Sequence, residues 1–189
     1  MKNKTFSLSS LVLALFLAAG ISSCSSPGEA ARGARRSEKA IETARETNDL
    51  LSSRRFSFVP RRALAQVPKY EYIDLTSYYE LTVTPDSIIS LLPYFGKAYS
   101  NMYDRPDRLS PLDFESTDFT YGQAGMPVGK EKAVIDIRTL ETSNGIQYCM
   151  KLEVYDNKSA TLTVSAPMST NLVFTGEITP IPAENPFVK

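Results

Sequence analysis

Cys24 lies where a bacterial secretion leader would be cleaved and acylated. Lys2 and Lys4 precede an apolar run from Leu11 to Ala19, and small residues lead up to the cysteine. A positive start, a short apolar core and small residues before a cysteine are typical of a lipoprotein leader. Because the run is shorter than the roughly 20 residues of a membrane-spanning helix, we expect residues 1–23 to be a signal peptide and Cys24 to be lipidated.

The remaining cysteine, Cys149, has little chemistry available to it. The chain has two cysteines and no histidine, so an acylated Cys24 leaves Cys149 without a disulfide partner. A reactive thiol needs a base or a positive neighbour that lowers its pKa, and histidine cannot supply one here. We expect a partly covered, unreactive thiol, and Ser–His–acid and Cys–His catalysis are excluded.

Three carboxylates, Asp113, Glu115 and Asp118, fall within six residues of one another. Such a group could hold calcium or provide an acid–base pair. On a strand, however, Asp113 and Glu115 share one face while Asp118 points to the other. We therefore expect no catalytic residue, no metal and no cofactor, and a carboxylate-dependent hydrolase of envelope sugars or peptides remains the alternative function.

An aromatic loop is the best candidate for a ligand or partner site. Tyr94, Phe95, Tyr99 and Tyr103 lie within the irregular segment 93–111, which is rich in proline and charge. Tyrosine combines a large contact area with a hydroxyl group, which suits sugars, peptides and protein surfaces. The alternative interpretation is that these rings plug one end of the fold.

The residues that follow Cys24 predict a helical spacer over 24–53. Ser26, Pro27 and Glu29 form a capping-box start. The helix that follows is rich in alanine, arginine and glutamate and has only a thin apolar stripe. A helix with so little to bury gains little from packing, so we expect it to hold the next domain away from the membrane.

Charge is distributed unevenly along a chain whose 21 basic and 21 acidic residues cancel. Residues 24–62 carry nine Lys/Arg against five Asp/Glu, whereas residues 63–189 carry ten against sixteen. The basic segment would favour anionic lipid head groups, or it is an ordinary solvated linker. An acidic folded domain argues against a nucleic-acid partner.

From Arg54 onward the apolar residues alternate with polar ones, which predicts antiparallel strands. Turn signals at Pro85–Asp86, Asn144–Gly145 and Asp156–Lys158 separate the strands, and positive φ is expected at both Asn144 and Gly145. Residues 114–121 read as one strand. We expect a mainly β meander of about eight strands over 54–179, folded into a barrel, half-barrel or sandwich, and then a proline-rich tail over 180–189.

The order of motifs resembles a family of short envelope lipoproteins, best known from Bacteroidetes and catalogued as a domain of unknown function of the DUF4251 type. The resemblance implies an envelope location and no known activity, and no site residue can be transferred from it. The residues that carry it are Arg55–Phe58, Ile73–Tyr79, Leu91–Tyr99, Phe114–Phe119 and Tyr155–Ala160.

These observations predict an envelope lipoprotein with a non-catalytic β-domain that binds or scaffolds a hydrophobic, glycan or protein partner. A carrier would enclose a dry cavity lined by the apolar strand faces, whereas an adaptor would have a solid core. Ser25 rather than aspartate follows Cys24, which favours an outer-membrane anchor facing the periplasm.

Overall fold

The computed structural model describes residues 27–65, 71–95, 110–127, 131–167 and 169–181. One helix, α2 (Pro27–Ser53), precedes the sheet in this part of the chain. It lacks the run of apolar residues that a helix needs to cross a bilayer. The contacts divide the chain between Glu38 and Lys39, so residues from Lys39 onward form one compact unit that includes the sheet.

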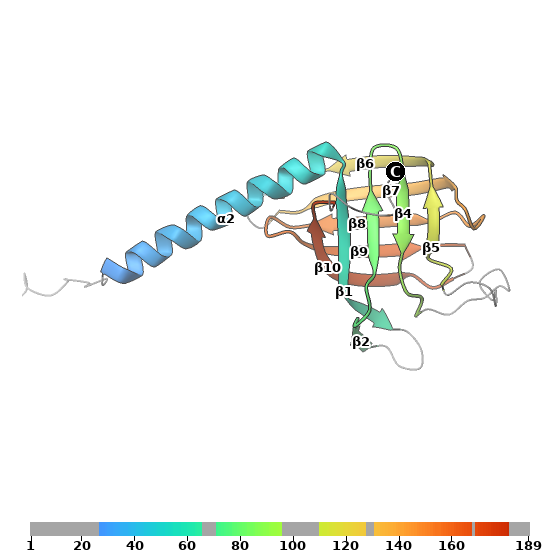
Figure 1. The fold of residues 1–189 in the computed structure, drawn as a ribbon, viewed down its shortest axis with the longest axis horizontal. Coiled ribbons are helices and arrows are strands. Elements are labelled where there is room, and N and C mark those ends of the chain that lie inside the picture. The colour runs from blue at the N-terminus through green and yellow to red at the C-terminus, as the bar shows by residue number, and fades with distance from the viewer. Residues whose placement is uncertain (1–26, 66–70, 96–109, 128–130, 168, 182–189) are drawn as a thin grey trace, which may run out of the picture. The chain divides into compact units, whose positions relative to one another are not determined.

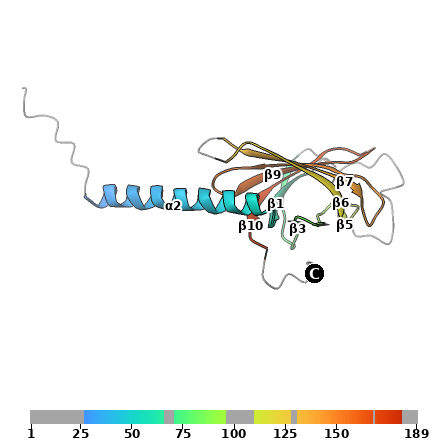
Figure 2. The ribbon, with the colours of Figure 1, turned by 90° about the horizontal axis from the view of Figure 1, so that it is seen from above.

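The described residues form one ten-stranded antiparallel sheet, which confirms the predicted mainly β class with two strands more than expected. The sheet is rolled into a nearly closed, barrel-like shape, with β1, β4 and β5 running across β7–β10 (Figure 1). Figure 2 shows the two halves of the sheet as separate layers. The strands are β1 (Phe56–Ala65), β2 (Glu71–Asp74), β3 (Glu80–Val83), β4 (Ile88–Leu91), β5 (Asp113–Ser116), β6 (Asp118–Ala124), β7 (Ala133–Glu141), β8 (Cys149–Val154), β9 (Ser159–Ser165) and β10 (Leu172–Thr179).

Strands that are neighbours in sequence mostly pair in space, as expected of a meander, but β1 also pairs with the last strand. The order is β5-β4-β3-β1-β10-β9-β8-β7-β6, and β2 pairs with the far end of β1. Ser57 lies opposite Thr179 and Ala63 opposite Phe174. The first and last strands therefore join the two layers.

The core lies between the two layers and is filled by the apolar faces of the strands. Phe56, Phe58 and Phe174 are fully buried, and aliphatic side chains from both layers complete one continuous cluster. The predicted alternation on β7, β8 and β9 is confirmed, because every second residue there is buried. Burial of these side chains stabilises the fold at about 25 cal/mol per Å² of apolar surface.

Gly176 permits a close approach between β1 and β10. The register of β1 shifts between Pro60 and Arg62, opposite Gly176 and Thr175. A Cβ atom at Gly176 would lie 2.1 Å from the carbonyl oxygen of Val59, which no side chain tolerates. The register shift in β1 therefore requires glycine at position 176 of the neighbouring strand.

The prediction of one strand over 114–121 is wrong, because the chain breaks at Thr117 into β5 and β6. Ser116 pairs with Ile88 of β4, whereas Asp118 pairs with Glu141 of β7. The Ser116 hydroxyl donates to the Glu141 carbonyl at 2.5 Å and ties the two ends of the sheet together. The break exists because the chain passes there from one layer to the other.

The turn at Asn144–Gly145 connects β7 and β8 as predicted, but only Gly145 has a positive φ, of 75°. Asn144 instead stabilises the turn through hydrogen bonds of its buried side chain. Its amide donates to the carbonyl of Pro111 at 2.8 Å and to the Tyr148 hydroxyl at 3.0 Å. The Tyr148 ring stacks on Phe114 at 4.3 Å, so this turn also fixes the entry into β5.

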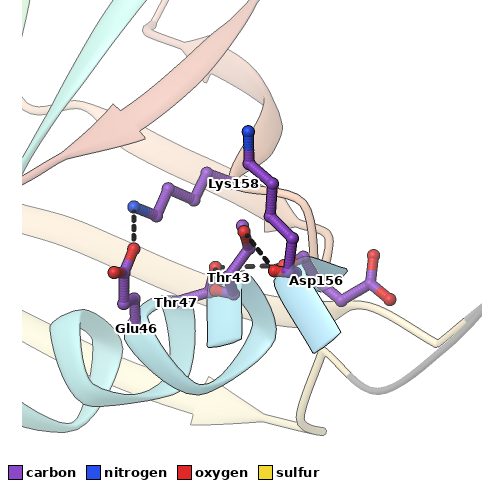
Figure 3. A network of polar contacts seen from close by, with 6 residues as sticks. Thr43, Glu46, Thr47, Asp156 and Lys158 are labelled. Atoms are coloured by element: carbon purple, nitrogen blue, oxygen red, sulfur yellow. Dashed lines mark hydrogen bonds and ion pairs between the residues drawn. The ribbon is translucent and has the colours of Figure 1, made fainter. Parts of the chain in front are cut away.

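The second half of α2 is part of the compact unit rather than a pure spacer. Leu51 is 1% exposed and Thr47 is fully buried. Figure 3 shows Lys158, in the turn between β8 and β9, directed at Glu46 of the helix. The Thr47 hydroxyl lies 2.7 Å from the Thr43 carbonyl and 3.2 Å from the Asp156 carbonyl of the same turn.

Candidate functional site

The predicted site residues fall partly outside the described chain. Cys24, Tyr99 and Tyr103 lie outside the described residues, so their roles stay predictions. Tyr94 and Phe95 are half-buried and pack against the core cluster. The part of the aromatic loop that the structure describes therefore contributes to the packing at one end of the sheet.

The three acidic residues do not converge. Asp113 and Glu115 are exposed on the same face of β5, as predicted, and Asp118 is exposed at the start of β6. Within the described ranges, no group of three or more potential metal ligands is close enough to hold an ion.

A groove of about 790 Å³ lies on the outer face of strands β6 to β9. The strand register places its outward-facing residues in two rows that cross the strands. One row runs through Thr120, Arg138, Cys149 and Ser165, and the other runs through Gly122, Asp136, Lys151 and Thr163. Tyr121, Ile137, Leu140, Met150 and Asn171 complete the lining.

The charged groups of this groove form few ion pairs with the described residues. Neither Arg138 nor Asp136 forms an ion pair with any described residue. Lys151 approaches Glu153 only to 4.0 Å, because Glu153 pairs more closely with Lys132, at 2.8 Å. The hydrogen bond from Lys132 to Glu153 raises the pKa of that lysine.

Cys149 lies in the groove with an exposed side chain. The expectation of a partly covered thiol is therefore wrong. The strand parity was assigned correctly, since Cys149 shares its face with Lys151. Its cross-strand neighbours are Arg138 and Ser165.

A second hollow, of about 310 Å³, lies beside the middle of β10 and the start of β9 and differs in its charges. Its two charged residues, Arg61 and Glu177, are joined by an ion pair of 2.6 Å. The charges here are already paired, whereas Asp136 and Arg138 of the groove form no ion pair with a described residue. The groove is therefore the better candidate for a functional site.

The fold and the groove define a small antiparallel β-domain with a packed interior and a groove lined by charged, hydroxyl and apolar groups on its outer face. A family described as "Domain of unknown function (DUF4251)" matches residues 38–178. The chain belongs to this family. The matched segment begins next to Lys39, the first residue of the compact unit.

A crystal structure of a DUF4251 family protein from Bacteroides eggerthii is similar to this chain, with a TM-score of 0.53 at 13% identity. The likeness covers 73% of this chain and 87% of that one. At this identity it supports the fold alone. No curated protein matches the chain.

Proposed function

We propose that this protein is a lipid-anchored envelope lipoprotein whose β-domain binds a polar partner, a glycan or a protein surface, in the groove on β6–β9 without catalysing a reaction. The groove, in which Asp136 and Arg138 have no ion-pair partner among the described residues, is the observation that carries the proposal. Its volume lies within the range of about 300–1,000 Å³ that is usual for ligand sites.

The interior favours an adaptor over a carrier of apolar ligands. The strand faces that would line a carrier's cavity pack against one another, and their side chains are 0–4% exposed apart from Leu64 at 9%. Hydroxyl and charged groups gather instead on the outside, where they can exchange hydrogen bonds with water for hydrogen bonds with a partner.

The same lining supports a binding role better than a hydrolytic one. Asp136 is the single carboxylate among the residues that line the groove. Hydrolysis by a carboxylate pair needs a second carboxyl group within roughly 5 to 10 Å of the first. Glu153, two residues beyond Lys151 on the same face of β8, is held in ion pairs with Lys132 and Lys151. We therefore assign Asp136, Arg138 and Lys151 to recognition rather than to catalysis.

The exposed thiol of Cys149 makes the groove directly testable. A benzophenone attached to Cys149 should crosslink a discrete partner in intact cells, and the same label on a Cys149→Ser, Asp86→Cys variant should not. Asp86 is exposed in the turn between β3 and β4 and lies outside the groove lining. The mass of the adduct after proteolysis separates a peptide from a glycan.

A charge reversal in the groove provides the second control. Arg138→Glu combined with Lys151→Glu should abolish the Cys149 adduct, whereas Arg61→Glu, in the other hollow, should leave it unchanged. Equal crosslinking from positions 86 and 149 would contradict the proposal. So would a Cys149 adduct that still forms in the variant with both Arg138→Glu and Lys151→Glu. The anchor is tested separately by labelling with radioactive palmitate, which should require Cys24.

A further inference from the structure

Three arginines, Arg32, Arg35 and Arg36, lie on one face of the first turns of α2. Each residue advances an α-helix by about 100°, so these spacings of three and four place the side chains within an arc of about 100°. All three are exposed. No ion pair joins any of them to a described residue. We call these three residues the arginine stripe.

Unpaired guanidinium groups in a row suit phosphate groups. The planar guanidinium donates two parallel hydrogen bonds to phosphate oxygens and is more weakly hydrated than an ammonium group. Ala34 and Glu38 lie on other faces of the same helix, about 200° and 240° around the axis from Arg32. No apolar residue of the first turns lies within the arc of the three arginines, and Glu29, three residues before Arg32, lies just outside it at about 60°. A contact through the stripe would therefore be electrostatic rather than an insertion of apolar side chains.

The stripe lies close in sequence to the proposed acylation site. Arg32 follows Cys24 by eight residues, and α2 begins at Pro27. Three residues span at most about 11 Å, and the helical residues up to Arg32 add about 1.5 Å each. The backbone of Arg32 can therefore be no further than about 20 Å from an acylated Cys24, and that of Arg36 no further than about 25 Å. A helix that lies along the bilayer brings the stripe into contact with it.

We infer that the arginine stripe binds the phosphate groups of anionic phospholipids, so that this part of α2 lies on the membrane that holds Cys24. This inference rests on the proposed lipid anchor. Each basic residue near an anionic surface contributes on the order of a factor of five in binding. Three of them give an interaction that is strong at low salt and weak at high salt.

Trypsin tests the stripe on the full chain, because it cleaves after the arginines themselves. The protein is purified in detergent and reconstituted into vesicles of phosphatidylglycerol and phosphatidylethanolamine, or of phosphatidylcholine alone. We expect cleavage after Arg35 and Arg36 to be at least about tenfold slower on the anionic vesicles. The difference should vanish in 0.5 M salt, and cleavage after Arg45 should be equal on both.

A variant removes the stripe and keeps a site for the protease. In Arg32→Gln, Arg35→Gln, Arg36→Gln, cleavage after Lys39 should lose the protection that anionic vesicles give it in the native protein. Arg45→Gln leaves the stripe intact and should keep that protection. Circular dichroism of both variants checks that the helix is retained.

The outcomes separate the stripe from the anchor. The inference is overturned if trypsin cleaves after Arg35 and Arg36 at the same rate on anionic and on phosphatidylcholine vesicles. It is also overturned if slower cleavage on the anionic vesicles persists in 0.5 M salt. The mass of the tryptic peptide 24–32 reports acyl chains on Cys24 in the same digest. An acylated peptide with an unprotected stripe refutes the stripe alone, and an unacylated peptide refutes the proposed anchor.

Discussion

The Nζ atom of Lys158 lies 2.6 Å from Oε2 of Glu46, and the two residues are 112 positions apart in the chain. The pair connects the turn between β8 and β9 to the second half of α2 (Figure 3). Lys158 also has a φ of 68°, in the left-handed region that favours glycine. One residue thus combines an ion pair with a strained backbone.

Substitutions at position 158 separate these two contributions. Lys158→Ala and Lys158→Gly both remove the ion pair, which is half-exposed on the Glu46 side and contributes at most about 1 kcal/mol. Glycine also relieves the left-handed backbone, so Lys158→Gly should be about 1 kcal/mol more stable than Lys158→Ala. Urea unfolding measures the difference, and an alanine variant as stable as the glycine variant would contradict it.

Leu51 and Ile41 form a matched pair on α2. Leu51 is 1% exposed and Ile41 is 69% exposed. Leu51→Ala should cost about 2–5 kcal/mol of unfolding free energy because it leaves a cavity in the core. Ile41→Ala should change stability by less than about 0.5 kcal/mol. Equal effects of the two substitutions on thermal unfolding would mean that residues 39–53 are not packed in the compact unit.

Gly176 and Gly122 provide a second comparison, within the sheet. Gly176→Ala should destabilise the protein by about 3 kcal/mol or more, because the new methyl group overlaps the Val59 carbonyl. At Gly122 the nearest atom to an added Cβ, the Asp136 carbonyl oxygen, is 3.9 Å away, so Gly122→Ala should lie within about 0.5 kcal/mol of the native protein. Denaturant titrations of both variants test this, and a tolerated Gly176→Ala would refute the close approach.

Tyr78 gives the protein a pH dependence above neutrality. Burial, followed by the hydrogen bond to Glu80 and the repulsion of its charge, raises the pKa of Tyr78 from 10.0 to about 12. Because the folded state favours the neutral phenol, this contribution to stability is present below pH 10 and is lost as the pH rises from 10 towards 12. The Tyr78→Phe variant should not show this loss of stability between pH 10 and pH 12.

Nuclear magnetic resonance of ring-labelled tyrosine measures the Tyr78 pKa directly. Glu80→Gln removes the negative charge, so it should lower the pKa of Tyr78. The partial burial of the phenol remains in this variant, but Tyr78 is 60% exposed, so most of the return towards the ordinary pKa should come from the loss of the Glu80 charge. A Tyr78 resonance that titrates at 10.0 in the native protein would disprove the contact with Glu80.

The strands from Ala133 to Thr179 could be predicted from the sequence because each is a local pattern. Alternation assigns the buried face of β8 and β9, and the turn residues Asn144–Gly145 and Asp156–Lys158 mark where the chain reverses. The pairing of β1 with β10 could not be predicted in the same way. It joins residues more than a hundred positions apart, and no short-range pattern specifies it.

The groove was missed for a related physical reason. The alternation of buried and exposed residues along β7 and β8 showed that Arg138, Cys149 and Lys151 point outward. Whether the outer face is hollowed there depends on the twist of the sheet and on which outward side chains are short. Thr120, Gly122, Thr163 and Ser165 are the short residues between the charged ones. A search for small outward residues in register on adjacent strands could have indicated a hollow there.

The pairing of β1 with β10 also determines when this domain can finish folding. During synthesis, Ser57 leaves the ribosome long before Thr179, its partner across the ladder. Until the last strand emerges, one side of β1 has no hydrogen-bonding neighbour, and the aromatic rings of Phe56 and Phe58 lack half of their contacts. Non-local pairing of this kind slows folding and leaves apolar surface exposed until the last strand has paired with the first.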